Sequence, residues 1–203
     1  MTEIENRWDA LYQAKDETGV SWFQERPQQS LDLIARSGIA KSDAIVDAGA
    51  GASRLAEYLL QEGYSDLTLL DMSATALQKA KARLPQDAPV QCVIADIRHW
   101  VPARIYRLWH DRAAFHFLTD PEDRRAYLSV VQSALAPGGF AVVGTFAPDG
   151  PEKCSGLPIV PYDGPRLAAT FGAAFRLIHS ETSDHSTPSG GQQRFHFGIL
   201  QKK

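Results

Sequence analysis

The stretch that decides the fold of this chain is Ala44-Ile45-Val46-Asp47-Ala48-Gly49-Ala50-Gly51-Ala52-Ser53-Arg54. Ile45 and Val46 are apolar and β-branched, as a strand buried on both faces of a parallel sheet requires. Gly49 and Gly51 permit positive φ and have no Cβ, so a ligand can approach the backbone of the turn closely. Apolar residues at helical spacing follow the turn. The stretch therefore predicts a strand, a glycine turn and a helix N-terminus, which is a nucleotide-cofactor arrangement, although a plain strand-to-helix turn shares the pattern.

Acidic residues end the next two apolar runs as well. Asp71 follows Leu67–Leu70 and lies twenty residues after Gly51, where a carboxylate can take both hydroxyls of a ribose whose other end rests on the glycine turn. Asp96 follows the third run, residues 90–95. Because ligands of open α/β sheets bind at the carboxyl ends of the strands, Asp47, Asp71 and Asp96 are expected to converge.

These motifs, together with Leu135-Ala136-Pro137-Gly138-Gly139 before a predicted strand, resemble the class I S-adenosylmethionine-dependent methyltransferases over about residues 42–147. The resemblance implies an α/β, three-layer Rossmann-like sandwich. Its sheet would have seven strands, mostly parallel, with one antiparallel C-terminal strand at the edge. Residues 1–203 would form a single domain, with an N-terminal helical cap (1–41) and a core (42–203). Ser53-Arg54 stands where a dinucleotide-binding protein would usually keep a third glycine, which counts against NAD.

The resemblance also implies how the cofactor, S-adenosylmethionine, would be held. The glycine turn would receive the methionine moiety, with Asp47 near by, and Asp71 the ribose. Asp96 would accept the exocyclic amine of adenine, and Ile97 would offer a backbone N–H and an apolar face. The predicted cofactor-binding residues of the core are Asp47, Gly49, Ala50, Gly51, Asp71, Met72, Asp96 and Ile97.

The N-terminal segment carries an aromatic cluster. Trp8 and Tyr12 lie on one face of a helix predicted over residues 3–15, and we expect them to pack the cap onto the core. Trp22 and Arg26 lie in an aromatic loop, where they could contact the cofactor or the substrate or could simply pack. The segment loosely resembles the cap of lysine methyltransferases that act on elongation factors.

The segment after the fourth predicted strand faces the methyl acceptor in the resembled family. Asp111, at the strand end, is predicted to hold a cationic group of the donor or the acceptor. His116 could be a general base, since imidazole titrates near neutrality, or a loop histidine bonded to the backbone. The loop from residue 148 to 162 and the segment after it are expected to form the acceptor wall, with Cys154, Tyr162 and His185. The histidines show no metal-ligand spacing, so no metal is expected.

Composition bounds the class of protein. The 203 residues carry a net charge of −3, which recommends neither nucleic acid nor an anionic membrane as a partner. Apolar runs fall far short of the ~20 residues that span a bilayer, and the polar start is unlike a signal peptide. The two cysteines, Cys92 and Cys154, form no disulfide framework, and Cys92 is expected in a core strand. A cytoplasmic location is expected.

The sequence therefore predicts a methyltransferase acting on an N, O or S nucleophile, with a small molecule favoured as the acceptor. A protein lysine methyltransferase is the alternative that the N-terminal similarity suggests. A non-catalytic cofactor-binding module also stays open, because a donor site can exist without activity. An NAD(P)-dependent oxidoreductase is disfavoured by Ser53 and by the lack of a Tyr-x-x-x-Lys catalytic pair.

Overall fold

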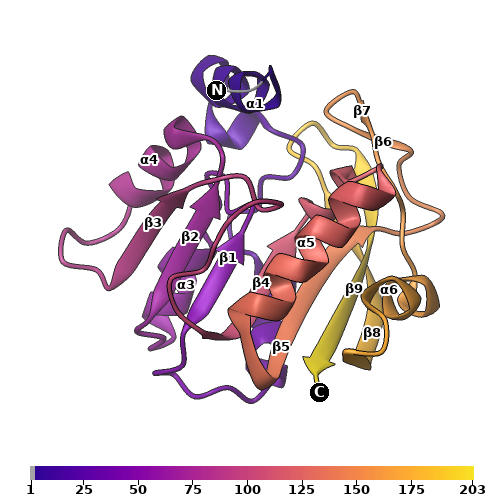
Figure 1. Cartoon of the computed structure of the whole chain (residues 1–203). Coiled ribbons are helices and arrows are strands. Elements are labelled where there is room, and N and C mark those ends of the chain that lie inside the picture. Colours follow the sequence, from indigo (N-terminus) through magenta and orange to yellow (C-terminus); the bar gives the residue numbers. More distant parts are fainter. Residues whose placement is uncertain (1–2) are drawn as a thin grey trace.

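The computed structural model describes residues 3–203 and arranges seven strands in one sheet, in the order β3-β2-β1-β4-β5-β9-β8 (Figure 1). The strands are β1 (Ile45–Ala48), β2 (Leu67–Asp71), β3 (Val90–Ile94), β4 (Tyr106–Arg112), β5 (Leu135–Phe146), β8 (Phe175–Ser186) and β9 (Gln192–Lys202). A separate hairpin pairs β6 (Lys153–Cys154) with β7 (Leu157–Pro158). The helices are α1 (Glu3–Ala14), α2 (Gln28–Arg36), α3 (Leu55–Gln61), α4 (Ala74–Ala82), α5 (Pro121–Ala134) and α6 (Gly164–Phe171), with 3-10 turns η1 (Glu17–Gly19) and η2 (Phe115–Phe117).

Side-chain alternation along the strands divides the core into two apolar layers. Ile45 and Val46 are neighbours in β1 but belong to different layers, because successive strand residues point to opposite faces. Helices α2, α3 and α4 contribute to the layer of Ile45, and α5 and α6 to that of Val46. The predicted three-layer sandwich is confirmed.

The C-terminal hairpin corrects one detail of the predicted sheet. Strand β9 is antiparallel, as expected, but it lies between β5 and β8 and is not an edge strand. Its apolar run, with Phe195, Phe197, Ile199 and Leu200 all buried, needs cover on both faces and therefore takes the inner position. Strand β8 alternates exposed residues with half-buried or buried ones and forms the edge.

Cys92 does not lie in a core strand. It is half-buried in β3, the opposite edge strand of the sheet, where Ile94 is 63% exposed. The apolar run over residues 90–95 predicted a buried strand, but the edge position leaves this strand without a neighbour on one side.

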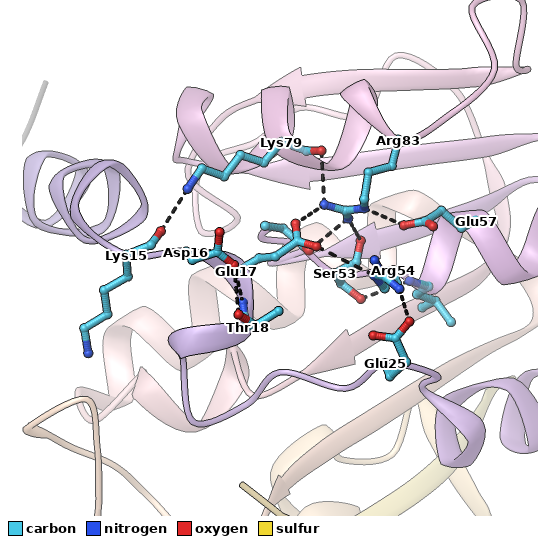
Figure 2. A network of polar contacts seen from close by, with 12 residues as sticks. Lys15, Asp16, Glu17, Thr18, Glu25, Ser53, Arg54, Glu57, Lys79 and Arg83 are labelled. Atoms are coloured by element: carbon cyan, nitrogen blue, oxygen red, sulfur yellow. Dashed lines mark hydrogen bonds and ion pairs between the residues drawn. The ribbon is translucent and has the colours of Figure 1, made fainter. Parts of the chain in front are cut away.

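Polar contacts fix the N-terminal cap to the core. Helix α1 lies beyond the carboxyl ends of β1 and β2 (Figure 1), and Asp9 accepts hydrogen bonds from the Ser73 hydroxyl and the Thr75 N–H at 2.8 and 2.9 Å. Figure 2 shows a second connection, in which Arg83 of the core pairs with both Glu17 of the cap and Glu57 of α3. The cap is thereby held against the edge at which the parallel strands end.

Candidate functional site

A cavity lies between the cap and the carboxyl ends of the parallel strands, with a volume of about 180 Å³. The predicted strand-end acids meet here, because β1, β2 and β3 run parallel. The lining residues that bear on function are Trp8, Tyr12, Trp22, Ser30, Asp47, Gly49, Ala50, Gly51, Asp71, Met72, Asp96, Ile97, His110, Arg112, Phe117 and Cys154.

The glycine turn uses its own amides internally. Gly49 and Gly51 have φ of +69° and +55°, in the left-handed region that favours glycine. The N–H groups of Gly49 and Ala50 donate to the Leu70 carbonyl at 2.8 and 3.1 Å, and that of Gly51 donates to the Asp71 carboxylate at 2.8 Å. A dinucleotide needs free N–H groups at this turn for its pyrophosphate, so the geometry favours a ligand without phosphate.

Asp71 is hydrogen-bonded directly to the glycine turn. One of its carboxylate oxygens accepts the Gly51 N–H and the other accepts the Ser73 N–H, each at 2.8 Å. Burial raises the pKa of Asp71 to about 6, and the nearby charge of Asp47 acts in the same direction. Each carboxylate oxygen has a second lone pair, so Asp71 can still accept two hydroxyl groups. Met72 lies beside it on the cavity wall.

Asp96 and Ile97 complete the far end of the cavity. Arg98 pairs with Asp96 and also with Asp123, at 2.9 Å in the second case. Burial disfavours the charge of Asp96, but the hydrogen bonds and the charge of Arg98 outweigh it and lower the pKa of Asp96. Ile97 is buried and offers an apolar surface. Both residues line the cavity where the prediction placed them.

Asp47 belongs to a buried hydrogen-bonded chain. One of its carboxylate oxygens lies 2.7 Å from His110 Nδ1, and His110 Nε2 lies 2.9 Å from the Ser30 hydroxyl. An ionised carboxylate only accepts, so His110 carries its proton on Nδ1, and in the neutral ring Nε2 accepts from Ser30. These hydrogen bonds fix the orientation of the Asp47 carboxylate.

Comparison with known proteins identifies the family. A family model described as a methyltransferase domain matches residues 45–139. The trans-aconitate 2-methyltransferase of Azoarcus sp. is 28% identical over 63% of this chain and 49% of its own length. The EEF1A lysine methyltransferase 2 of Danio rerio is 23% identical, over 67% of this chain and 65% of its length. The chain belongs to the class I S-adenosylmethionine-dependent methyltransferases.

The match covers part of each relative, and the fold is shared with a solved structure. The chain spans about half the length of the trans-aconitate methyltransferases that it matches. The N-methyltransferase NodS from Bradyrhizobium japonicum, solved with S-adenosyl-L-homocysteine, has the same fold, with a TM-score of 0.69 at 14% identity over 96% of this chain and 98% of that one.

The lining residues fit the methyl donor of the family. S-adenosylmethionine carries a sulfonium cation and no phosphate, and the wall combines Asp47 and Asp71 with the aromatic rings of Trp8 and Trp22. Carboxylates and aromatic faces both attract a cation. The amides of the glycine turn are not needed for such a ligand.

Asp111 lies behind the methyltransferase cavity and not on its wall. Its side chain is fully buried and accepts the N–H groups of Ala114 and Phe115 at 3.0 and 3.1 Å and the hydroxyl of Tyr127 at 2.8 Å. Burial raises the pKa of Asp111 to about 6. The predicted contact with a cationic group finds no support in this position, since the carboxylate holds the start of η2.

His116 is also buried away from the cavity. Its Nδ1 accepts the N–H of Phe146 at 3.3 Å, as the alternative of a loop histidine bonded to the backbone predicts. Burial and the charge of Arg112 lower the pKa of His116 to about 3, so the ring is neutral and weakly basic. The structure does not bring it together with the cofactor-binding residues.

The cap contributes more to the cavity than the sequence analysis predicted. Trp22 lines the cavity, as the first of its two predicted alternatives requires, but so do Trp8 and Tyr12, for which only packing was predicted. The rings of Trp8 and Tyr12 lie edge-on to Trp22, at centroid distances of 6.0 and 6.3 Å. Gly51 faces Tyr12 so closely that a Cβ built on it would lie 2.5 Å from the tyrosine hydroxyl. The same apolar helix face thus packs and lines the site, a dual role that periodicity cannot reveal.

Arg26 lies outside the cavity. It is exposed, stacks over Tyr58 with its guanidinium carbon 4.6 Å from the ring centroid, and pairs with Glu62 at 3.1 Å. Its position therefore gives no support to a cofactor-binding role.

Of the predicted acceptor wall, only Cys154 lines the cavity. Tyr162 is buried against Phe115 on the other face of the sheet, and His185 bonds to the Ser21 carbonyl at 2.8 Å. In the described part of the chain, no group of three or more His, Cys, Asp or Glu residues is arranged to hold a metal ion. No helix among residues 3–203 is long and apolar enough to span a membrane.

Proposed function

We propose that this chain transfers the methyl group of S-adenosylmethionine to a small-molecule acceptor. The observation that carries the proposal is the set of acidic strand ends around a glycine turn whose amides are already used. The small-molecule acceptor is supported by the relatives, several of which are trans-aconitate 2-methyltransferases. Methylation of a protein lysine is the second candidate, supported by the match to the zebrafish enzyme.

The residues on the cavity wall have separate roles in this proposal. Asp71 accepts the two ribose hydroxyls, Asp96 and Ile97 flank the adenine, and Asp47, oriented by His110, faces the ammonium group of the methionine moiety. S-adenosylmethionine would supply an electrophilic methyl carbon: the nucleophile bonds to it in line with the C–S bond, which breaks and releases S-adenosylhomocysteine. The protein therefore has to align the nucleophile and exclude water, and Trp8 and Trp22 provide the apolar cover.

A labelling experiment tests the proposal. The purified chain is incubated with methyl-labelled S-adenosylmethionine and a cell extract, and the protein and small-molecule fractions are separated. We expect label in the small-molecule fraction and formation of S-adenosylhomocysteine. Label in protein lysine would favour the second candidate, and binding of S-adenosylhomocysteine without turnover would favour the non-catalytic module. Calorimetric binding of NAD in its place would refute the proposal. The single domain over 1–203, its cap (1–41) and core (42–203), and the cytoplasmic location stay predictions.

A further inference from the structure

Arg112 is a cation on the cavity wall that forms no ion pair with the described residues. It ends β4, beside the glycine turn, and is half-buried. One guanidinium nitrogen, Nη1, donates to the Trp22 carbonyl at 2.9 Å, and the group lies over the Phe195 ring, 4.8 Å from its centroid. The other nitrogen, Nη2, is buried and has no hydrogen-bond partner. None of the ion pairs found among residues 3–203 includes Arg112.

Two other half-buried arginines that lie near carboxylates are paired differently. Arg83 and Arg98 are both shielded from solvent, and each contacts two carboxylates. An enclosed cation without an anion is unfavourable, because burial removes hydration that nothing replaces. Burial lowers the pKa of Arg112 to about 10, so the side chain is still charged at neutral pH.

The protein itself offers Arg112 no free anion. Burial lowers the pKa of His116 and of His185, and the nearby charge of Arg112 lowers both further. Both rings are therefore neutral. Burial raises the pKa of the Cys154 thiol to about 11, so this neighbour is neutral too. Asp47 exerts some attraction on Arg112, but its carboxylate is bonded to His110. A carboxylate of a ligand in the cavity would supply the direct contact to Nη2 that the described residues do not make.

We propose that Arg112 binds a carboxylate of the methyl acceptor, so that the acceptor of this enzyme is a small organic acid. The inference rests on the proposed function and adds the chemical class of its substrate. A guanidinium group presents a planar fork of donors that matches a carboxylate, and its Nη2 is uncommitted. Trp22, Phe117 and Cys154 add apolar wall on the same cavity, which suits an acid with an apolar or unsaturated part.

The carboxylate of the donor's methionine moiety is the other source of such an anion, and the experiment separates the two. Wild type, Arg112→Met and Arg112→Lys are titrated calorimetrically with S-adenosylhomocysteine, and with 5′-methylthioadenosine, which lacks the amino-acid portion. Acetate, benzoate and trans-aconitate are then titrated into each protein saturated with S-adenosylhomocysteine, with benzamide as a neutral control. Arg107→Met is the matched control variant, since Arg107 is a half-buried arginine of the same strand that stacks on Phe140 outside the cavity.

We expect at least one of the three acids to bind the wild type more tightly than benzamide, and Arg112→Met to weaken that binding by about tenfold or more. Arg112→Lys should lose less, because it keeps the charge without the fork, and Arg107→Met should not differ from wild type. Binding of S-adenosylhomocysteine should change much less than binding of the acid in Arg112→Met and Arg112→Lys, and should not change in Arg107→Met. The variants' melting temperatures show whether they are folded.

Three results would overturn the inference. The first is that none of the acids binds the wild type. The second is that the acid that binds the wild type best binds folded Arg112→Met and Arg112→Lys equally tightly. The third is that Arg112→Met weakens binding of S-adenosylhomocysteine but not of 5′-methylthioadenosine, which would assign Arg112 to the donor. Failure of the wild type to bind S-adenosylhomocysteine at all would instead refute the proposed function, so the two failures are distinguishable.

Discussion

Replacing Asp71 by asparagine tests the donor site most directly. The substitution keeps the shape of the side chain but removes its charge and turns one acceptor oxygen into an NH₂ donor. Asp71 presently holds the N–H groups of Gly51 and Ser73, one on each oxygen. The asparagine can keep one of these two bonds and can accept only one ribose hydroxyl.

The expected loss of affinity follows from the bonds that disappear. A hydrogen bond to a charged group contributes about 1.5–3 kcal/mol, and the variant loses one such bond and weakens the other. We therefore expect Asp71→Asn to bind S-adenosylhomocysteine at least about tenfold more weakly than wild type. Asp71→Ala is a poorer test, because it would leave both backbone N–H groups without a partner inside the protein.

Stability should change little, because two effects oppose each other. The pKa of Asp71 is raised from 3.8 to about 6, so burying its charge at pH 7 disfavours folding by about 3 kcal/mol. Asparagine removes that penalty, whereas the lost bond to one backbone N–H costs about 1–3 kcal/mol. We expect the melting temperature of the variant to equal that of wild type or exceed it.

Calorimetry at pH 7.5 and thermal denaturation measure the two quantities. Asp66→Asn is the control, since Asp66 lies at the start of the same strand segment and pairs only with the exposed Arg104. An Asp71→Asn protein with wild-type melting temperature and an affinity within twofold of wild type would refute the assignment of the ribose to this carboxylate.

The pH dependence has a definite sign. Because the pKa of Asp71 in the free protein is raised, the carboxyl takes up a proton as the pH falls through about 6, and it must lose that proton to accept the ribose hydroxyls with full strength. Affinity for S-adenosylhomocysteine should therefore fall below pH 6 in wild type and change much less in Asp71→Asn. For folding the sign is opposite: the raised pKa favours the native state most below pH 3.8, and this contribution is lost as the pH rises to about 6.

Four further substitutions probe the cap and the sheet. Trp22→Ala and Trp8→Ala should each weaken binding of S-adenosylhomocysteine by about fivefold or more, because both rings line the cavity. If calorimetry gives wild-type affinity for both folded variants, these rings do not cover the donor. Asp9→Ala should lower the free energy of unfolding in urea by about 1–3 kcal/mol and speed amide exchange in α1, since Ser73 and Thr75 lose their acceptor; unchanged exchange would contradict this. Gly144→Ala should lower the melting temperature by about 3–9 °C, because its Cβ would lie 2.3 Å from the Phe197 ring, and an unchanged value would show that the ring moves freely.

The sequence predicted the parts of the site that depend on local pattern. Gly49 and Gly51 have the expected positive φ, and Asp71 reaches back to the turn as a spacing of twenty residues suggests. Parallel strands then bring Asp47 and Asp96 to the same edge without further information. These features follow from strand direction and from the conformational freedom of glycine, both of which can be inferred from local sequence.

The sequence did not reveal how deeply the side chains of the predicted acceptor segment are buried. Asp111 and His116 occupy the expected segment, but each side chain points into the protein interior, because alternation along β4 and the 3-10 turn after it decide the direction. Arg112 directly follows Asp111 but lines the cavity, and the sequence analysis assigned it no role. A shift of one residue in a strand changes the face, and apolar pattern alone does not fix it where both faces are buried.

The contacts of Trp22 couple the two halves of the cavity. Its ring packs on Tyr12, which covers Gly51 on the donor side, and its carbonyl accepts a hydrogen bond from Arg112 on the acceptor side. A donor that displaces the Tyr12 hydroxyl from Gly51 must therefore move or order the loop that positions Arg112. Because ordering the loop once lowers the entropy lost by the second ligand, we expect the acceptor to bind more tightly after the donor than before it. The coupling must be reciprocal, so an acid that binds at Arg112 should raise the affinity for S-adenosylhomocysteine by the same factor. If the acid binds the free protein and the protein saturated with S-adenosylhomocysteine with equal affinity, the loop is already ordered in the free protein.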